Sequence, residues 1–243
     1  MLSSCKFGTD WAFKAKTDKI NLDFISTSKV NILKITIFLV IAYLLGAIPN
    51  GLWIGKLFYH KDIRNYGSHN IGATNALRVL GVFPGVVCMI LDIAKGSIAT
   101  LLPIWFNIDF WNIKPTMLIF GIMAILGHSA SIFDHFHGGK AVATSAGMLL
   151  VYSPWLFVYC FSMMVIMTLL TSMVSFASLF SFTTVTIIIL LIHDWYLFPL
   201  AVILTIFVYY KHRSNIIRMV HGHENLIHYG LVYWHMKKKH ATK

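Results

Sequence analysis

Charged side chains are scarce in this sequence, and acidic ones are the scarcest. Only 12% of the 243 residues are Asp, Glu, Lys or Arg, against roughly a quarter in ordinary soluble domains. Hydrophobic residues make up 57% of the chain, and the mean hydropathy is +0.71. Such a chain lacks the polar surface that a water-soluble globule needs. The composition therefore predicts an all-α, polytopic integral membrane protein.

Several chemistries are excluded by what the sequence does not contain. The chain has three cysteines with no close spacing, namely Cys5, Cys88 and Cys160. An odd, scattered set indicates neither a disulfide framework nor a Cys-based metal site. The pairs His135/His137 and His221/His223 have no His-Glu-x-x-His pattern or acidic cluster beside them. We therefore expect no metal and no cofactor.

The net charge of +11 does not indicate a nucleic-acid partner. The lysines and arginines occur as short groups between apolar runs, without a continuous basic face, which suits loops beside a membrane better than a duplex. Polarity divides the chain into a polar N-terminal tail over 1–34, a membrane domain over 35–224 and a basic C-terminal tail over 225–243. The aromatic and lysine residues of this last tail predict an interfacial anchor on anionic lipid.

The apolar runs predict about seven membrane-spanning helices. They cover residues 35–57, 79–106, 117–133, 141–171, 179–192 and 195–210. The fourth run counts as two short helices, because Ser153-Pro154 disfavours a continuous helix. Gly46, Pro49 and Gly51 predict an irregular end to the first span.

Basic residues favour one set of the predicted loops. The loops 56–78 and 134–140 and the C-terminal end contain almost all the loop lysines and arginines, whereas the opposite set contains only Lys114. A further loop on the basic side is predicted over 172–178. The basic bias of cytoplasmic loops therefore places these segments in the cytoplasm and, with seven spans, the N-terminus outside.

The stretch from Gly67 to Arg78 is the most informative part of the chain. Its closely spaced glycines and polar side chains precede a predicted helix, so backbone N–H groups can turn toward one anion. The side-chain donors are Ser68, Asn70, Thr74 and Asn75. The alternative is a polar loop that only caps the helix. Arg78 favours an anion site, because a guanidinium at the start of a membrane helix needs a partner.

A second patch contains Gly138-Gly139-Lys140 just before a predicted helix. It resembles half a phosphate loop, but without the full Gly-x4-Gly-Lys-Ser/Thr spacing it does not indicate nucleotide hydrolysis. The alternative is a turn followed by an interfacial lysine. Asp92 and Lys95 share a helix face, either as substrate contacts or as a self-neutralising ion pair.

Two further pairs have the spacing of one helix face. Ser175 and Ser178 either face a substrate or bond back to helix carbonyls. His212 and Asn215 either face a site or belong to a basic membrane-exit anchor, together with Lys211 and Arg213.

In this order, the motifs resemble the bacterial membrane-integral acyl-phosphate:glycerol-3-phosphate acyltransferase family, from about Ala42 to Glu224. The residues that carry the resemblance are Gly46-Ala-Ile-Pro49, Asp62-Ile-Arg64, Gly67-Ser-x-Asn-Ile-Gly-Ala-Thr-Asn75 with Arg78, Leu91-Asp-x-x-Lys-Gly96, Gly127-His128, Gly138-Gly-Lys140 with Ala143-Thr144, Val174-Ser-x-Ala-Ser178 and His212-Arg-x-Asn215. Each motif is weak alone, and the ordered combination is specific.

The resemblance implies transfer of a fatty acyl group from acyl phosphate to the sn-1 hydroxyl of glycerol 3-phosphate, giving lysophosphatidic acid, the first step of phospholipid synthesis. It implies a multi-pass protein of the bacterial inner membrane whose site faces the cytoplasm. Membrane lipid and an acyl-phosphate-producing enzyme are the implied partners. The implied catalytic residues are Ser68, Arg78, Lys140, Ser178, His212 and Asn215.

The stretch Gly72-Ala73-Thr74-Asn75 is similar to the phosphate cradle of the family. We add Asn70, Gly138, Gly139 and Lys95 as expected phosphate-binding residues. Because an acyl phosphate is already activated, the reaction requires neither a nucleophilic side chain nor a metal. A substrate phosphate or His212 is the expected base.

The sequence departs from the family pattern at five positions. Ala47 stands where serine is usual, His69 and Ala141 replace common glycines, His137 a common lysine and Ser131 a common proline. We expect the lost hydroxyl and lysine charge to lower substrate affinity, and His69 to adopt a positive φ less cheaply than glycine. An organic-phosphate transporter and an inactive paralogue remain the alternative functions.

Overall fold

The computed structural model describes residues 32–108, 112–227 and 229–235. The chain divides into two compact units, Met1–Val40 and Ile41–Lys243. The first unit is described only over residues 32–40, which are helical, so most of the predicted N-terminal tail lies outside the described residues. The fold and the site below belong to the second unit.

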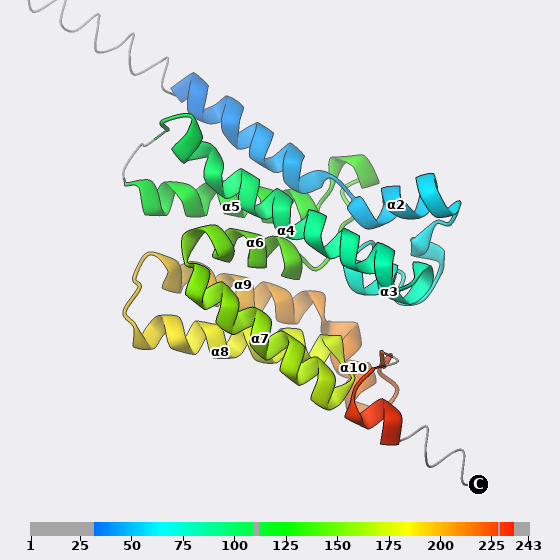
Figure 1. Ribbon diagram of the computed structural model, residues 1–243. Helices are drawn as coiled ribbons and strands as arrows, with labels where there is room; N and C mark the ends of the chain where they lie inside the picture. The colour runs from blue at the N-terminus through cyan, green and yellow to red at the C-terminus, as the bar shows by residue number, and fades with distance from the viewer. Residues whose placement is uncertain (1–31, 109–111, 228, 236–243) are drawn as a thin grey trace, which may run out of the picture. The chain divides into compact units, whose positions relative to one another are not determined.

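The described residues are almost entirely helical, in agreement with the predicted all-α class (Figure 1). A helix over Ile32–Ala47 precedes the labelled elements. These are α2 (Asn50–Tyr59), η1 (Ile63–Asn65), α3 (Ala73–Leu80), α4 (Val82–Trp105), α5 (Ile113–Ser129), η2 (Ile132–Asp134), α6 (Val142–Tyr152), α7 (Pro154–Thr171), α8 (Val174–Leu191), α9 (Leu197–Lys211) and α10 (Arg213–Val220).

Seven apolar helical segments fit the predicted count of about seven. The helices α4, α7 and α8 are long and apolar enough to cross a membrane, and the helix Ile32–Ala47 and α2 meet the same criterion only as a pair, which is bent by 48°. The shorter apolar helices are α5, α6 and α9. At about 1.5 Å per residue, the 11 residues of α6 cover only about half of a ~30 Å hydrocarbon core.

The helix α7 has the exposure expected of a lipid-facing helix. It is apolar around its circumference, yet Leu156 is its only buried residue. Large side chains such as Trp155, Val158 and Leu169 are about half exposed. Apolar surface of this extent is stable against lipid rather than water, which confirms the membrane class.

Two helix breaks follow the sequence signals. The first span bends between Ala47 and Asn50, around Pro49, and then resumes as α2, whereas the sequence predicted only an irregular end. The break between α6 and α7 falls at Ser153, so the prediction of two helices within 141–171 is confirmed.

Two other predicted boundaries were wrong. The predicted loop over 172–178 is helical from Val174, because Ser178 is accommodated in α8 by donating its hydroxyl to the Val174 carbonyl. The predicted span over 79–106 begins instead with the end of α3. Gly81, at φ +108°, separates this end from α4.

Close backbone contacts hold α4 against α6 (Figure 1). A Cβ atom on Gly147 would lie 2.0 Å from the carbonyl oxygen of Ile93, and one on Gly96 would lie 2.2 Å from that of Thr144. Small residues at such contacts let membrane helices approach to backbone distance. This contact fixes the position of the N-terminal end of α6, which forms part of the candidate site.

Candidate active site

A cavity of about 130 Å³ lies where four helices begin. The first turn of each of α3, α6, α8 and α10, or the residue that caps it, contributes to the lining. Unpaired N–H groups in a first turn give a helix N-terminus a partial positive charge. Four such ends around one cavity form a positive environment before any side-chain charge is counted.

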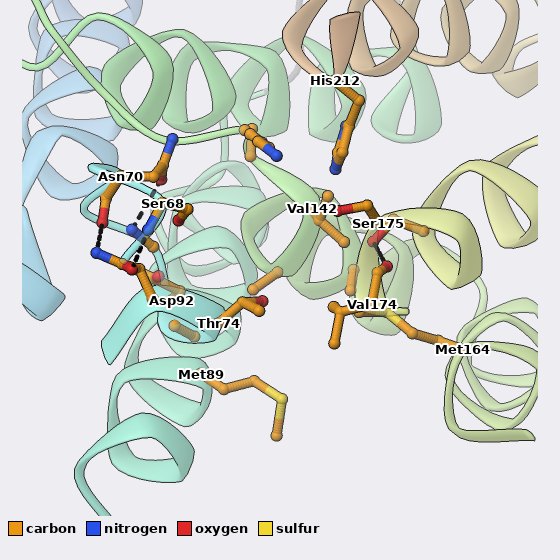
Figure 2. A pocket seen from close by; sticks show the side chains of 18 of the residues that line it. Ser68, Asn70, Thr74, Met89, Asp92, Val142, Met164, Val174, Ser175 and His212 are labelled. Carbon is orange, nitrogen blue, oxygen red and sulfur yellow. Dashed lines mark hydrogen bonds between the residues drawn. The ribbon is translucent and has the colours of Figure 1, made fainter. Parts of the chain in front are cut away.

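The six residues that the sequence predicted as catalytic all line this cavity. They are Ser68, Arg78, Lys140, Ser178, His212 and Asn215. Figure 2 shows Ser68, Asn70 and Thr74 on one side and His212, Val174 and Ser175 on the other. The cavity therefore brings together six residues from motifs that lie far apart in the sequence, between Ser68 and Asn215.

Arg78 lines the cavity and has an unsatisfied donor. Its Nη2 donates to the Asn225 carbonyl oxygen at 2.9 Å, whereas its buried Nε has no hydrogen-bond partner. Burial lowers the pKa of this guanidinium from its usual value, although arginine remains protonated in proteins. A buried, unpartnered donor on a cation has a strong demand for an anionic ligand.

Lys140 is held by an amide rather than by a carboxylate. Its Nζ donates to Oδ1 of Asn215 at 2.5 Å. Burial lowers the pKa of Lys140 to about 8, with Glu224 opposing the shift and Arg218 and Arg78 adding to it. The lysine is therefore mostly charged at pH 7 and close to losing that charge.

Glu224 connects the elements behind the cavity. Its Oε1 accepts hydrogen bonds from the Ser175 hydroxyl and the Asn215 amide, both at 2.7 Å, and its Oε2 accepts one from Arg218 Nε at 3.0 Å. The side chain is 1% exposed. Because Asn215 also holds Lys140, one carboxylate orients the amide that positions the lysine.

Glu224 was not among the residues predicted from the sequence. It is the only glutamate in the chain and stands nine residues after Asn215. Its being the only glutamate was the signal that the sequence offered. Its contact with Ser175 is not predictable from spacing, because Ser175 lies on α8, far from Glu224 in the sequence.

The segment after Glu224 packs against the junction of α7 and α8. The Ile227 N–H donates to the Ser172 carbonyl oxygen at 2.9 Å, and the Tyr233 N–H donates to the Ser172 hydroxyl at 3.0 Å. Ser172 itself is fully buried and has φ +58°. These contacts fix the backbone that presents Glu224 and the Asn225 carbonyl, so part of the predicted C-terminal tail supports the site.

Asn75 organises the glycine-rich loop from within. Its Oδ1 accepts from the Ser68 N–H, and its Nδ2 donates to the carbonyl oxygens of Ile63, Tyr66 and Asn70. Asn70 in turn accepts from the Gly72 N–H at 2.9 Å. Both ends of the Asn75 amide are therefore committed to the loop, although the residue lines the cavity.

Ser178 and His212 differ in the hydrogen-bonding groups that remain available. Ser178 donates back to Val174 O at 2.8 Å, which is the helix-bonding alternative, and still lines the cavity. His212 Nδ1 lies 2.8 Å from the Val208 carbonyl, which fixes the proton on that nitrogen. Burial and then the Lys140 charge lower the pKa of His212 to about 4. At pH 7 the ring is therefore neutral, and Nε2 is its acceptor.

The Asp92–Lys95 pair is buried within α4. Lys95 Nζ contacts Asp92 Oδ1 at 2.8 Å and donates to the Ile48 carbonyl at 2.8 Å. Asp92 also accepts from Asn50 at 2.9 Å. Asp92 lines the cavity and Lys95 does not, so these contacts favour the ion-pair alternative over a phosphate contact for Lys95.

The other residues predicted to bind phosphate do not all line the same cavity. Gly72, Ala73, Thr74 and Asn75 line the cavity with Asn70. Gly138 lines a neighbouring cavity instead, and Gly139 packs its backbone on His128, where a Cβ would lie 2.2 Å from Nε2. The two glycines thus shape the turn that carries Lys140 and do not line the same cavity as Lys140.

The departures from the family pattern also have defined places. His69 and Ala141 have φ +56° and +58°, so the prediction that position 69 demands a positive φ is confirmed. Ala47 is fully buried and does not line the cavity. Its carbonyl accepts a hydrogen bond from the Ser131 hydroxyl.

Part of the cavity lining is apolar. It includes Met89, Ile93, Phe161 and Met164. A second, smaller apolar cavity of about 60 Å³ shares Phe161, Met164 and Ser178 with it and continues among α6, α8 and α9. These apolar residues were not predicted from the sequence, because their helices carry no motif and are alike in composition.

A metal centre has no support in the side-chain geometry. Within residues 32–108, 112–227 and 229–235, no group of three or more His, Cys, Asp or Glu side chains is placed to hold an ion. The absence of a metal requirement stays a prediction for the assay below.

Four helix N-termini, two partly buried cations and an adjoining apolar space define a membrane protein whose cavity suits an amphiphilic anion. Comparison with known proteins agrees with this class. The chain belongs to the glycerol-3-phosphate acyltransferase family, whose model matches residues 36–222.

Several relatives share most of their length with this chain. A glycerol-3-phosphate acyltransferase of Levilactobacillus brevis is 53% identical over 207 residues, covering 85% of this chain and all of the relative. That of Enterococcus faecalis is 46% identical over 221 residues, covering 87% and 100%. The crystal structure of PlsY (YgiH), an integral membrane glycerol 3-phosphate acyltransferase in its glycerol 3-phosphate form, matches with a TM-score of 0.73 and 33% identity, covering 80% of this chain and 96% of that one.

Replacing Lys95 by Met should destabilise the fold more than it alters substrate binding. The variant leaves Asp92 as an uncompensated buried charge, which costs roughly 3–5 kcal/mol. We expect a lower unfolding midpoint in detergent, partial recovery in the Asp92→Asn/Lys95→Met double variant, and no change for the exposed Lys114→Met control. A normal midpoint with a raised KM for a phosphate substrate would instead make Lys95 a ligand.

Proposed function

We propose that this protein transfers a fatty acyl group from acyl phosphate to the sn-1 hydroxyl of glycerol 3-phosphate, releasing lysophosphatidic acid and inorganic phosphate. The carrying observation is the composition of the 130 Å³ cavity, whose lining combines Arg78, Lys140 and four helix N-termini with apolar side chains such as Met89 and Phe161. Such a cavity suits a phosphate headgroup joined to an acyl chain. Membership of the glycerol-3-phosphate acyltransferase family supports the acceptor.

The binding roles follow from charge and from donor geometry. The unpartnered Nε of Arg78 and the Nζ of Lys140 each bind a phosphate oxygen, and the N–H groups of Ala73 and Thr74 add donors from α3. Ser68 and Ser178 supply hydroxyls at the same lining. The acyl chain extends past Phe161 and Met164 into the smaller apolar cavity.

The reaction needs positioning more than it needs a nucleophilic residue. The acceptor hydroxyl oxygen attacks the acyl carbonyl carbon, the bond from that carbon to the phosphate oxygen breaks, and phosphate departs with the bonding electrons. Holding two phosphates beside Arg78 and Lys140 offsets their mutual repulsion and orients the attack. The new ester bond and the released phosphate balance the substrates once the hydroxyl proton is placed.

A substrate phosphate is the better base for that proton. Its second pKa is about 6, whereas burial lowers the pKa of His212 to about 4. The pKa of the phosphate is therefore about two units higher than that of His212, so the phosphate binds the proton more strongly. The Nε2 of His212 serves to orient the acceptor hydroxyl through a hydrogen bond.

The test compares acyl donors with purified protein in detergent. Acyl phosphate with glycerol 3-phosphate should give lysophosphatidic acid and phosphate in equal amounts, acyl-CoA should give none, and chelation should leave the rate unchanged. Arg78→Ala should lower kcat/KM per folded molecule by about ten- to hundredfold, because it removes a charged hydrogen bond.

Three results would contradict the proposal. Transfer from acyl-CoA alone would replace the donor, and a loss restored specifically by Zn²⁺ or Mg²⁺ would replace the mechanism. Uptake of glycerol 3-phosphate by sealed vesicles without acyl transfer would favour a transporter.

The titration of Lys140 predicts the alkaline limb of the pH profile. Its pKa is lowered to about 8, so the positive charge is present below pH 8 and is lost as the pH rises through that value. The kcat/KM for glycerol 3-phosphate, which reports the free enzyme, should fall above about pH 8. In Lys140→Arg the fall should move to higher pH, because arginine stays protonated. An unmoved limb in that variant would assign the titration to another group.

We also propose that the motif loops face the cytoplasm of a bacterial cell, with an acyl-phosphate-producing enzyme supplying the donor there. The basic loop residues support this orientation. A cysteine introduced at Asn65 should react with an impermeant reagent only after the membrane is opened, whereas Cys5 should react in intact cells. Labelling of position 65 in intact cells would reverse the topology.

A further inference from the structure

Arg64 lies at the meeting point of the two long segments that lead into the candidate site. Residues 60–72 precede α3 and contain Ser68, and residues 130–141 precede α6 and contain Lys140. The other two helices whose first turns line the cavity, α8 and α10, follow connections of one or two residues. The relative position of the two long segments therefore decides how far the donors of the glycine-rich loop lie from Lys140.

The guanidinium of Arg64 joins these two segments. Its Nε and Nη2 donate to the two carboxylate oxygens of Asp62, at 2.9 and 2.6 Å, and its Nη1 donates to Oδ1 of Asp134 at 2.5 Å. The bidentate contact with Asp62 fixes the plane of the guanidinium, because both parallel N–H groups are engaged. The remaining Nη1 is thereby aimed at the second segment.

Asp134 makes this contact a constraint on both segments. Its side chain is 4% exposed, whereas that of Arg64 is 37% exposed. Ion pairs between two exposed side chains contribute little to stability. A buried carboxylate that loses its partner, in contrast, is left as an uncompensated charge. Asp134 therefore holds Arg64, and the segment that contains it, against residues 130–141.

On the side of the glycine-rich loop, the backbone around Arg64 belongs to the structure that Asn75 organises. The carbonyl oxygens of Ile63 and Tyr66 accept hydrogen bonds from Asn75 Nδ2, at 2.8 and 3.1 Å. Oδ1 of the same amide accepts from the Ser68 N–H at 2.8 Å. A displacement of Arg64 would therefore also displace the backbone at Ser68 and the N-terminal end of α3.

On the side of Lys140, Asp134 belongs to a turn that backbone hydrogen bonds close. Its carbonyl oxygen accepts from the His137 N–H at 2.9 Å, and Ser131 forms an isolated antiparallel bridge with His137. The Gly139 N–H then donates to a carbonyl oxygen of α5 at 3.0 Å. Lys140 follows directly, so this turn connects Asp134 with the backbone of the lysine.

We propose that Arg64 and Asp134 are positioning residues, whose ion pair sets the distance between the glycine-rich loop and Lys140 and thereby the relative placement of the two substrates. Neither side chain lines the cavity that contains Lys140, so both act through other residues. The effect on the reaction rests on the proposed acyl transfer, whereas the link between the two segments stands on their contacts alone.

Steady-state kinetics of the full-length protein in detergent test the positioning role. Arg64→Gln should lower kcat per folded molecule by about ten- to hundredfold, because a misplacement of ~1 Å costs up to about a hundredfold in rate. The KM for glycerol 3-phosphate should change much less, since Ser68 and Lys140 keep their own contacts with Asn75 and Asn215. Arg64→Lys, which keeps the charge, should retain more of kcat than Arg64→Gln.

Two kinetic results would contradict this role. A raised KM at unchanged kcat would make Arg64 a substrate ligand, and unchanged kcat and KM in the folded fraction would leave the ion pair with a purely structural role.

The double variant Arg64→Gln/Asp134→Asn keeps the test readable if Arg64→Gln folds poorly, because it leaves no unpaired charge at position 134. Two residues that act through one contact have effects that do not multiply. The double variant should therefore be no slower than Arg64→Gln alone. A loss equal to the product of the two single losses would show that the residues act independently and would overturn the proposal.

Lys56→Gln is the matched control. Lys56 also lies in this charged cluster, 3.4 Å from Asp62, but its side chain is 50% exposed and its partner is on the side of the glycine-rich loop. Removing this charge leaves the contact between Arg64 and Asp134 in place. The variant should therefore keep the wild-type kcat.

Hydrogen exchange followed by mass spectrometry measures the link without turnover. Arg64→Gln should speed exchange several-fold over residues 130–141, and Asp134→Asn should do so over residues 60–72, because each segment loses its support from the other. Lys56→Gln should leave exchange over 130–141 unchanged. Faster exchange confined to the substituted segment would overturn the link. If wild-type protein transferred no acyl group, the proposed function would fail, and these exchange rates would still decide whether the link exists.

Discussion

The carboxylate of Glu224 is the contact on which the rest of the site depends. It is buried, and it accepts from Ser175 and Asn215, with Arg218 on its other oxygen. Removing one partner of such a buried network leaves an unpaired charge, whereas the intact network fixes three elements in one geometry. Its negative charge also favours the charged form of Lys140 against the repulsion of neighbouring cations. A cavity that collects cations for a phosphate needs such an anion behind it while no phosphate is bound.

Backbone breaks provide the other part of the site. In a membrane every N–H and C=O must be paired, so polar backbone can be offered to a ligand only where helices begin or end. The chain satisfies this constraint with short connections, which include the single residues Gly81 and Ser153 and the left-handed Ala141 before α6. The first turns of α3, α6, α8 and α10 reach one cavity; α8 and α10 follow connections of one or two residues, and α3 and α6 follow the longer segments 60–72 and 130–141. The break near Pro49 follows the same rule, because Lys95 donates to the Ile48 carbonyl.

Much of this arrangement was predictable from sequence, and the limits are physical. Motif order identified Ser68, Arg78 and Asn215, and X-Pro sterics located the break at Ser153. The role of Glu224 was not predictable, because it depends on Ser175 from a distant helix. Helical spacing alone could not decide whether Lys95 faced a ligand or its own carboxylate. The start of α8 was misplaced because a polarity profile counts serines as loop residues, whereas in lipid they bond back to the helix.

The left-handed residues show why the pattern tolerates substitutions. His69 and Ala141 occupy positive-φ positions that the resemblance assigns to glycine, at a cost of about 1–2 kcal/mol each. The bond from His69 Nδ1 to the Arg64 carbonyl offsets part of that cost. The loop geometry itself is set by Asn75, whose amide holds Ser68 and three carbonyls from the interior. Because that interior amide is intact, the substitution at position 69 changes the side chain that lines the neighbouring cavity and leaves the N-terminal end of α3 in place.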